Sequence, residues 1–237
     1  MKLIAFLSLF MFSSVLANLT ISFSSLSTKY ASVQNEIIDT HNLYRRNTDP
    51  SARNMLKMEW SKEAQSIAEL WAKECTMSHS PPENRFISSY SCGENIFYST
   101  APKSWKTVID FLGDEKEYFE YGIGAKSDKI IGHYTQMVWY KSFLIGCAVT
   151  QCNYTNYSVF FYVCEYCPAG NINSLAYPYK AGPPCDDCKD FCSDGLCTNP
   201  CPYEDFYYGC AQYKIFCQDP YIFNYCTATC SCESEIV

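Results

Sequence analysis

Cysteine constrains the fold of this chain more than any other residue type. The 237 residues include 16 cysteines, an even number that allows every thiol to pair. The chain begins with one lysine and an apolar run that ends in small residues near Ala17, the pattern of a secretory signal. Exported chains keep cysteines as disulfides, whereas zinc clusters, the alternative for so many thiols, fit an export signal poorly. We therefore expect residues 1–17 to be removed and the mature chain to be secreted with its cysteines bridged.

The cysteines are unevenly distributed, and this distribution predicts two domains. Residues 18–184 contain six cysteines and residues 185–237 contain ten. The first region has enough apolar residues for a core, whereas the second depends on bridges that each contribute roughly 2–4 kcal/mol. Between them, the Pro/Gly-rich stretch 177–184 is typical of a linker. Residues 18–32, rich in Ser and Thr, are expected to be flexible.

The charge excludes some classes of partner. The formal net charge of −7 makes nucleic acid and anionic membrane surfaces poor partners. After the signal, no apolar run is long enough to cross a bilayer. We expect a soluble, monomeric protein without a transmembrane segment.

Hydrophobic periodicity predicts helices around a mainly antiparallel sheet, an α+β fold. Helices are expected near 33–46, after an N-cap at Ser61 and from Ser104, and strands over 92–97, 144–149 and 158–166. The second helix is expected to bury one stripe, formed by Ala64, Ile67, Ala68, Trp71 and Cys75. The strand at 158–166 is apolar on both faces, which is typical of a covered central strand.

Two ionisable residues fall where burial is expected. His133 lies in the aromatic, apolar segment 130–139, and Glu115 lies beside the apolar stripe of the third helix. A buried imidazole or carboxylate needs a hydrogen-bond partner, an opposite charge or a metal. His79, at the end of the second helix, is a further candidate.

Several longer motifs resemble a known family. Two segments are similar to the signatures of the CAP superfamily, namely Gly132-His-Tyr-Thr-Gln-Met-Val-Trp139 and Phe161-Tyr-Val-Cys-Glu-Tyr-Cys-Pro-Ala-Gly-Asn171. Shorter matches are His41-Asn42, Arg45-Arg46, the segment 54–60, Cys92-Gly-Glu-Asn95 and the segment 195–201. With its ten-cysteine tail, the chain resembles the cysteine-rich secretory proteins of that superfamily over residues 33–237.

The resemblance implies an α-β-α sandwich followed by a hinge and a small helical domain. It divides the chain into a signal peptide at 1–17, a flexible segment at 18–32, a CAP domain at 33–176, a linker and disulfide hinge at 177–200 and an ion-channel-regulator domain, similar to sea-anemone toxins (ShKT), at 201–237. It also implies the bridges Cys75–Cys152, Cys92–Cys167, Cys147–Cys164, Cys185–Cys192, Cys188–Cys197, Cys201–Cys232, Cys210–Cys226 and Cys217–Cys230.

The resemblance further implies a cleft in which two histidines and two glutamates converge. The matching residues are His79, Glu94, Glu115 and His133. They could hold Zn²⁺ weakly or conditionally, although no cofactor is required, and the alternative is a hydrogen-bonded cluster without metal. Gly113 stands where relatives often carry a bulkier residue, and it could loosen the helix and shift Glu115.

Catalysis has little support. Ser78 and Ser80 flank His79, but nothing in the sequence marks an oxyanion hole or a nucleophile elbow. A metal-activated water is the better route to hydrolysis if there is any. We therefore expect no catalytic residues and a protein that is not an enzyme.

The tail predicts binding. Residues 185–237 contain nine carboxylates, two lysines and ten aromatic residues, more than so small a domain can bury. Tyr213, Lys214 and Phe216 are candidates for contact with an ion channel, as in toxins that present a lysine beside an aromatic. The alternative is a solvated acidic domain without a channel target.

Three N-glycosylation sequons are present, at Asn18, Asn153 and Asn156. Asn153 and Asn156 are neighbours in a predicted loop, so we expect one of the two to carry glycan.

These observations together predict a secreted binding protein that acts on cell-surface or ion-channel proteins. The resemblance implies roles in sperm maturation, sperm–egg interaction and channel regulation, with a segment matching 161–172 implicated in egg-surface binding in relatives. The alternatives are a venom or salivary channel-blocking toxin and a zinc-dependent hydrolase.

Overall fold

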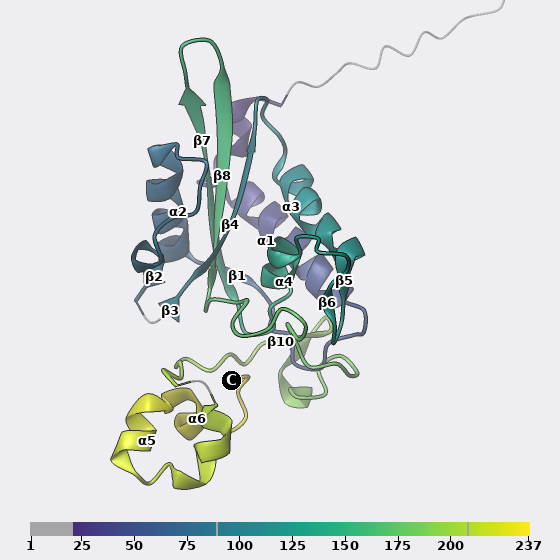
Figure 1. Cartoon of the computed structure of the whole chain (residues 1–237), viewed down its shortest axis with the longest axis vertical. Helices are drawn as coiled ribbons and strands as arrows, with labels where there is room; N and C mark the ends of the chain where they lie inside the picture. Colours follow the sequence, from purple (N-terminus) through teal and green to yellow (C-terminus); the bar gives the residue numbers. More distant parts are fainter. Residues whose placement is uncertain (1–20, 89, 208) are drawn as a thin grey trace, which may run out of the picture.

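A computed structural model describes residues 21–88, 90–207 and 209–237. Four strands form the central sheet in the order β1-β7-β8-β4: β1 (Glu59–Trp60), β7 (Leu144–Asn153), β8 (Ser158–Cys167) and β4 (Gly93–Ser99). β1 pairs parallel with β7, and the other pairs are antiparallel. Helix α2 (Lys62–Glu74) lies on one side of the sheet, and α1 (Ala31–Arg46), α3 (Trp105–Gly113) and α4 (Gly132–Met137) lie on the other (Figure 1). The predicted α+β sandwich is confirmed, while the expected signal peptide and the Asn18 sequon lie outside the described residues.

The helices begin where the sequence predicts. The Ser61 hydroxyl accepts a hydrogen bond from the amide of Ala64, and the Ser104 hydroxyl accepts one from the amide of Thr107. The fully buried residues of α2 are Ala64, Ala68 and Ala72. Ile67 and Trp71, which belong to the expected stripe, are half-buried and pack against the margins of the core.

The closeness of α2 to the sheet explains this choice of small side chains. A Cβ atom at Gly146 of β7 would lie 2.0 Å from the amide nitrogen of Gln65. The backbones of α2 and β7 are therefore in direct contact, and only alanines fit the face between them.

The core on the opposite side of the sheet includes residues expected to be flexible. The 3₁₀ helix η1 (Phe23–Leu26) places Leu26 in the cluster that contains Ile37, Trp105 and Tyr162, and Trp105 Nε1 donates a hydrogen bond to the carbonyl of Leu26 at 2.9 Å. The flexibility expected for residues 18–32 is therefore wrong for 21–32. Although most of this segment is polar, the Leu26 side chain fills part of the core and its carbonyl satisfies the buried Trp105 indole.

The structure has eight disulfides, and they are the eight pairs that the resemblance implies. Among the described residues, no cysteine is left free. The hinge contains η4 (Lys189–Phe191) and a small hairpin of β9 (Cys192–Ser193) and β10 (Leu196–Cys197). The first domain also contains the short 3₁₀ helices η2 (Pro82–Asn84) and η3 (Asp114–Tyr118). Two separate two-stranded ribbons are formed by β2 (Phe86–Ile87) with β3 (Tyr90–Ser91) and by β5 (Phe119–Glu120) with β6 (Gly124–Ala125).

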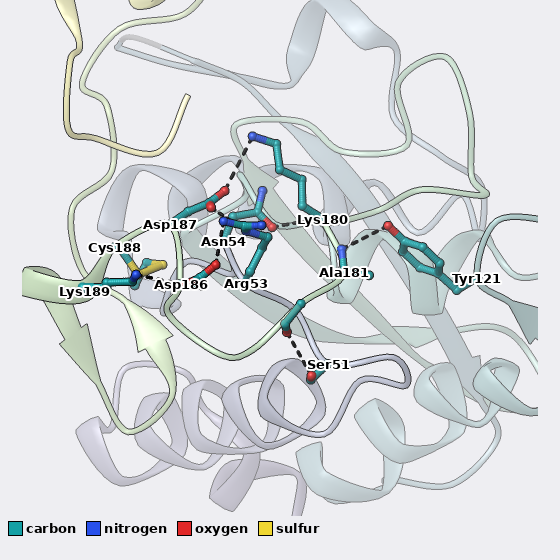
Figure 2. A network of polar contacts seen from close by, with 12 residues as sticks. Ser51, Arg53, Asn54, Tyr121, Lys180, Ala181, Asp186, Asp187, Cys188 and Lys189 are labelled. Carbon is teal, nitrogen blue, oxygen red and sulfur yellow. Dashed lines mark hydrogen bonds and ion pairs between the residues drawn. A yellow bond between two sulfur atoms is a disulfide. The ribbon is translucent and has the colours of Figure 1, made fainter.

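The segment expected to be a linker is fastened to the first domain. The amide of Cys197 donates to the carbonyl of Met55, and the carbonyl of Cys197 accepts from the amide of Lys57, both at 2.8 Å. Figure 2 shows Asp186 and Asp187 pointing toward Arg53, whose guanidinium lies 2.7 Å from the first carboxylate and 2.5 Å from the second. The hinge is thus an extension of the first domain and not a spacer.

The small domain contains η5 (Cys210–Phe216), α5 (Pro220–Tyr225) and α6 (Thr227–Ser231), held by three disulfides. Its last residues return to the first domain. Ile236 is 6% exposed in a cluster with Leu56 and three hinge cysteines, and the hydroxyl of Tyr140 donates to the carbonyl of Val237 at 2.9 Å. The small domain is therefore anchored at both of its ends, since Pro200 pairs with Ile236.

Candidate site at the edge of the sheet

Four elements bring the predicted site residues to the edge of the sheet formed by β4. Glu94 lies on β4, and His79 lies in the loop that follows α2. Glu115 lies on η3, and His133 is the second residue of α4. The structure joins them as two separate histidine–glutamate pairs.

The first pair is His79 with Glu94. His79 Nδ1 donates to Glu94 Oε1 at 2.7 Å, and the backbone amide of Ser80 donates to the same oxygen at 2.9 Å. Burial by itself would raise the pKa of Glu94, but the hydrogen bonds from His79 and Ser80 outweigh it and lower that pKa. Glu94 is therefore an ionised carboxylate that fixes the His79 ring.

The second pair is His133 with Glu115. His133 Nδ1 donates to Glu115 Oε1 at 2.6 Å. The other oxygen accepts from the backbone amides of His133 at 2.8 Å and Tyr134 at 3.1 Å. Glu115 thus satisfies amides at the start of α4 and orients the imidazole at the same time. Glu115, which lies beside the buried stripe of α3 and was expected to need a partner, has one in His133.

Gly113 does not loosen the helix before Glu115. Its backbone is helical, and α3 continues directly into η3. A Cβ atom here would lie 2.4 Å from two carbons of the Tyr44 ring. A side chain at this position would have to displace the Tyr44 ring, which favours glycine, and the expected shift of Glu115 is not supported.

A buried hydrogen-bond chain links the sheet to α1 and α4. Asn95 Nδ2 donates to the carbonyl of His133 at 3.1 Å and to the Tyr166 oxygen at 3.2 Å. The Tyr166 hydroxyl in turn bonds Nε2 of His41 at 2.9 Å, and Nδ1 of His41 donates to the carbonyl of Ile37 at 2.8 Å. Burial lowers the pKa of His41 to about 4, so this imidazole is neutral and structural. Sequence reasoning quoted His41 as a family match but assigned it no role.

Arg45 supports the other end of α4 and was also missed. It is 1% exposed. Its guanidinium donates to the carbonyls of Leu56, Met137, Trp139 and Tyr140 at 2.8–3.1 Å. A cation that satisfies the free carbonyls at a helix C-terminus also complements the helix dipole.

The two pairs could supply metal ligands through their histidines. In each pair Nδ1 bonds a carboxylate, which leaves Nε2 as the free donor atom, and this is the usual arrangement of a metal-binding histidine. Within the described ranges, the only compact group of three potential ligands is Cys185, Cys188 and Cys197, and all three are in disulfides. Each histidine is therefore oriented by its glutamate as a metal ligand would be, whereas the four residues do not form one compact group of ligands in the described ranges.

The serine arrangement considered for hydrolysis does not form. The hydroxyl of Ser80 accepts from Arg85 Nε at 3.0 Å, while Nδ1 of His79 is directed at Glu94. In the part of the chain that the structure describes, neither Ser78 nor Ser80 has a hydroxyl hydrogen bond to His79.

Glu165 is a further residue that sequence reasoning overlooked. It lies directly across from Glu94 in the β4–β8 ladder and is 1% exposed. Burial, together with the charge of Glu94, raises the pKa of Glu165 to about 9. The signal was available, because a glutamate in a strand that is apolar on both faces is unexpected.

The candidate contact residues of the tail lie on η5, and they differ in exposure. Phe216 is 53% exposed and Lys214 is exposed, whereas Tyr213 is partly covered by packing against Tyr207. Asn153 and Asn156, the candidate glycosylation sites, are both exposed where β7 turns into β8. No helix in the described segments is both long and apolar enough to cross a membrane.

Comparison with known proteins places this fold. The family model for the cysteine-rich secretory protein family, CAP, matches residues 38–166, and the Crisp model matches residues 185–237. The crystal structure of Na-ASP-1 is 29% identical with a TM-score of 0.61 over 76% of this chain; the chain spans 50% of Na-ASP-1.

Two further solved structures are similar. NaASP2 with Zn²⁺ is 28% identical with a TM-score of 0.59, over 71% of this chain and 96% of that protein. Venom allergen-like protein 4 of Schistosoma mansoni shares the fold at 23% identity and a TM-score of 0.52, over 63% of this chain and 95% of that one. Many disulfides and the CAP fold are typical of extracellular proteins. The chain belongs to the cysteine-rich secretory protein family of the CAP superfamily.

Proposed function

We propose that this protein is a secreted, non-enzymatic binding protein that acts at cell surfaces and contacts its partner through the small C-terminal domain. The partner is a cell-surface protein or the outer face of an ion channel. Family membership supports roles in sperm maturation and sperm–egg interaction, and a channel-blocking toxin would use the same surface.

The observation that carries the proposal is the apolar surface of the small domain. Phe206 is 82% exposed, Ile215 81% and Tyr221 66%. Other large apolar residues exposed on this domain are Tyr203, Tyr207, Phe216, Phe223 and Tyr225. Disulfides hold the backbone that presents these side chains, so little conformational entropy is lost when a partner covers them. We refer to Phe206, Ile215, Phe216 and Tyr221 as the exposed apolar group of the small domain.

The charge of this region favours a covering contact over a pore plug. Residues 185–237 carry nine carboxylates and two lysines. Lys189 is paired with Asp186 at 3.1 Å, so within the described tail only Lys214 has an amine without an ion pair. A single lysine in an acidic domain is a weak attractor for a cation pore.

The test is surface binding by the full-length protein. Replacing Phe206, Ile215 and Phe216 with serine should reduce binding to sperm, eggs or channel-expressing cells by about tenfold or more, as loss of large apolar contact residues usually does. The matched control is Phe86→Ser with Ile130→Ser, which removes two exposed apolar side chains from the first domain. Equal loss in both variants, or loss only in the control, would contradict the proposal.

A second candidate function is zinc binding by His79 and His133. It is supported by their free Nε2 atoms and by similarity to NaASP2, which was solved with Zn²⁺. Calorimetry with zinc chloride should give saturable heat for the wild type and for Glu120→Gln, a control at an exposed carboxylate that belongs to neither histidine pair. His133→Gln should remove that heat, and equal heats in all three proteins would refute the site.

A further inference from the structure

The hinge holds four cysteines in two bridges whose sulfur atoms lie close together. Cys185 is paired with Cys192, and Cys188 is paired with Cys197. The Sγ atoms of Cys185, Cys188 and Cys197 all lie within 4.8 Å of one another. Disulfides are exchanged when a thiolate attacks one of the two bonded sulfurs. If Cys185 became a thiolate, its sulfur would therefore already lie beside the other bridge.

The backbone of the hinge also suits a second pairing of the same four cysteines. The amide of Cys188 donates to the carbonyl of Cys185 at 3.0 Å, which closes a turn. The ends of such a turn have Cα atoms within about 7 Å of each other. Cys192 and Cys197 lie directly opposite each other in the β9–β10 hairpin, where Cα atoms of opposite residues are about 4.5–5.5 Å apart. Since disulfides usually join Cα atoms about 4.4–6.8 Å apart, the pairs Cys185–Cys188 and Cys192–Cys197 fit this backbone as well.

The four cysteines differ in their access to solvent. Cys192 is exposed. Cys185 is 5% exposed, Cys188 3% and Cys197 0%. A thiol from solution can therefore attack the first bridge at Cys192, whereas the second bridge is shielded. An attack at Cys192 expels Cys185, the cysteine whose sulfur lies beside the shielded bridge.

We propose that the hinge is a disulfide switch with two pairings, and that an external thiol converts one into the other. The thiolate RS⁻ attacks Cys192 Sγ, which gives the mixed disulfide RS–S–Cys192 and releases Cys185 as a thiolate. Cys185 then attacks Cys188 Sγ, which forms the Cys185–Cys188 bridge and releases Cys197 as a thiolate. Finally Cys197 attacks the Cys192 sulfur of the mixed disulfide, which forms the Cys192–Cys197 bridge and expels RS⁻. The thiol is regenerated, and the protein is neither oxidised nor reduced overall.

The exchange would change how the hinge is cross-linked. In the pairing described above, both bridges join the turn at 185–188 to the β9–β10 hairpin. In the second pairing one bridge stays within the turn and the other within the hairpin. The turn is fastened to Arg53 (Figure 2), and the hairpin is fastened to the backbone of Met55 and Lys57. The switch therefore removes the cross-link between two separate attachments to the first domain, whatever partner the small domain binds.

The test is disulfide mapping of the full-length protein after incubation with cysteamine in the absence of air. Cysteamine is a small thiol whose ammonium group suits a hinge with four aspartates and one lysine over residues 185–197. After free thiols are blocked with N-ethylmaleimide, trypsin cleaves at Lys180 and Lys189 and so cuts out residues 181–189. In the pairing described above, this peptide stays linked to the next one by two bridges. In the second pairing it is released with an internal disulfide and no maleimide, and mass spectrometry should find it only after cysteamine treatment.

Two controls separate the switch from general reduction. The three bridges of the first domain should remain intact in the same samples. The double variant Cys185→Ser with Cys192→Ser lacks the exposed bridge, so its Cys188–Cys197 bridge should resist cysteamine and take up no maleimide. Absence of the released peptide from the wild type at every cysteamine concentration tested would overturn the proposal. Release of that peptide without thiol, or maleimide on Cys188 in the double variant, would also overturn it.

Discussion

Replacing Gly113 with alanine tests the account of how Glu115 is positioned, because two effects of opposite sign compete at this position. Gly113 has helical dihedral angles, φ −73° and ψ −22°. In a helix, alanine is favoured over glycine by about 1 kcal/mol. The new Cβ atom, however, would lie 2.4 Å from two carbons of the Tyr44 ring, which is far inside van der Waals contact.

The steric effect should win in the wild-type background. Forcing an extra methyl group into a packed site typically costs about 1–3 kcal/mol. After the helix-propensity gain is subtracted, Gly113→Ala should lower the free energy of unfolding by up to about 2 kcal/mol. When the ring is removed by Tyr44→Ala, the same substitution should instead raise that free energy by about 1 kcal/mol. The coupling between the two positions is then the steric cost itself, about 1–3 kcal/mol.

The assay is urea unfolding with the disulfides intact, followed by tryptophan fluorescence, on the wild type, both single variants and the double variant. The four free energies close a double-mutant cycle. NMR of His133 in Gly113→Ala reports whether the strain reaches the Glu115 pair. Stabilisation by Gly113→Ala in the wild-type background, or additivity in the cycle, would refute the packing argument.

Four other predictions concern the core, the anchored tail and the two buried glutamates. Leu26→Ala should lower the free energy of unfolding by about 2–5 kcal/mol, measured by urea unfolding, and a change below ~0.5 kcal/mol would show that the N-terminal segment is not part of the core. Ile236→Ala should speed hydrogen exchange at the amide of Cys201, which bonds the carbonyl of Ile236, and unchanged exchange would contradict the anchoring of the tail. Because the pKa of Glu94 is lowered in the folded state, ionised Glu94 stabilises the fold above the ordinary carboxyl pKa, and this contribution is lost as the pH falls. Glu94→Gln should therefore make the free energy of unfolding less dependent on pH on the acid side. The pKa of Glu165, raised to about 9, acts in the opposite sense: the folded state holds a proton that the unfolded state releases, and stability falls as the pH rises from about 4.5. Glu165→Gln should therefore raise the unfolding midpoint at pH 8 more than at pH 4, and an equal effect at both would be inconsistent with that shift.

Local signals in the sequence predicted much of the fold. The caps at Ser61 and Ser104 and the covered strand at 158–166 depend on short-range chemistry, and the structure has them at these positions. The disulfide pairs followed from family resemblance, because spacing alone leaves many connectivities open.

Other features depend on contacts between segments far apart in the chain. The Ser- and Thr-rich composition around Leu26 predicted a flexible segment, whereas Leu26 lies in the core because it packs with and bonds to Trp105. The periodicity of α2 did not show that its alanines are its most buried residues, because this depends on the close approach of Gly146. The role of Arg45 was also not predictable from local sequence, because one of its carbonyl partners, Met137, belongs to α4, 92 residues further along the chain. The two histidine pairs were foreseen as one cluster, whereas each glutamate is committed to its own imidazole.

The double anchoring of the small domain has a consequence for recognition. Pro200, where the domain begins, and Ile236, where it ends, lie side by side, and Ile236 packs against Leu56 of the first domain. A receptor broad enough to touch both domains would meet two surfaces whose mutual orientation is already set. It would lose little rotational freedom in engaging the second surface after the first, as with a bivalent ligand built on a stiff frame.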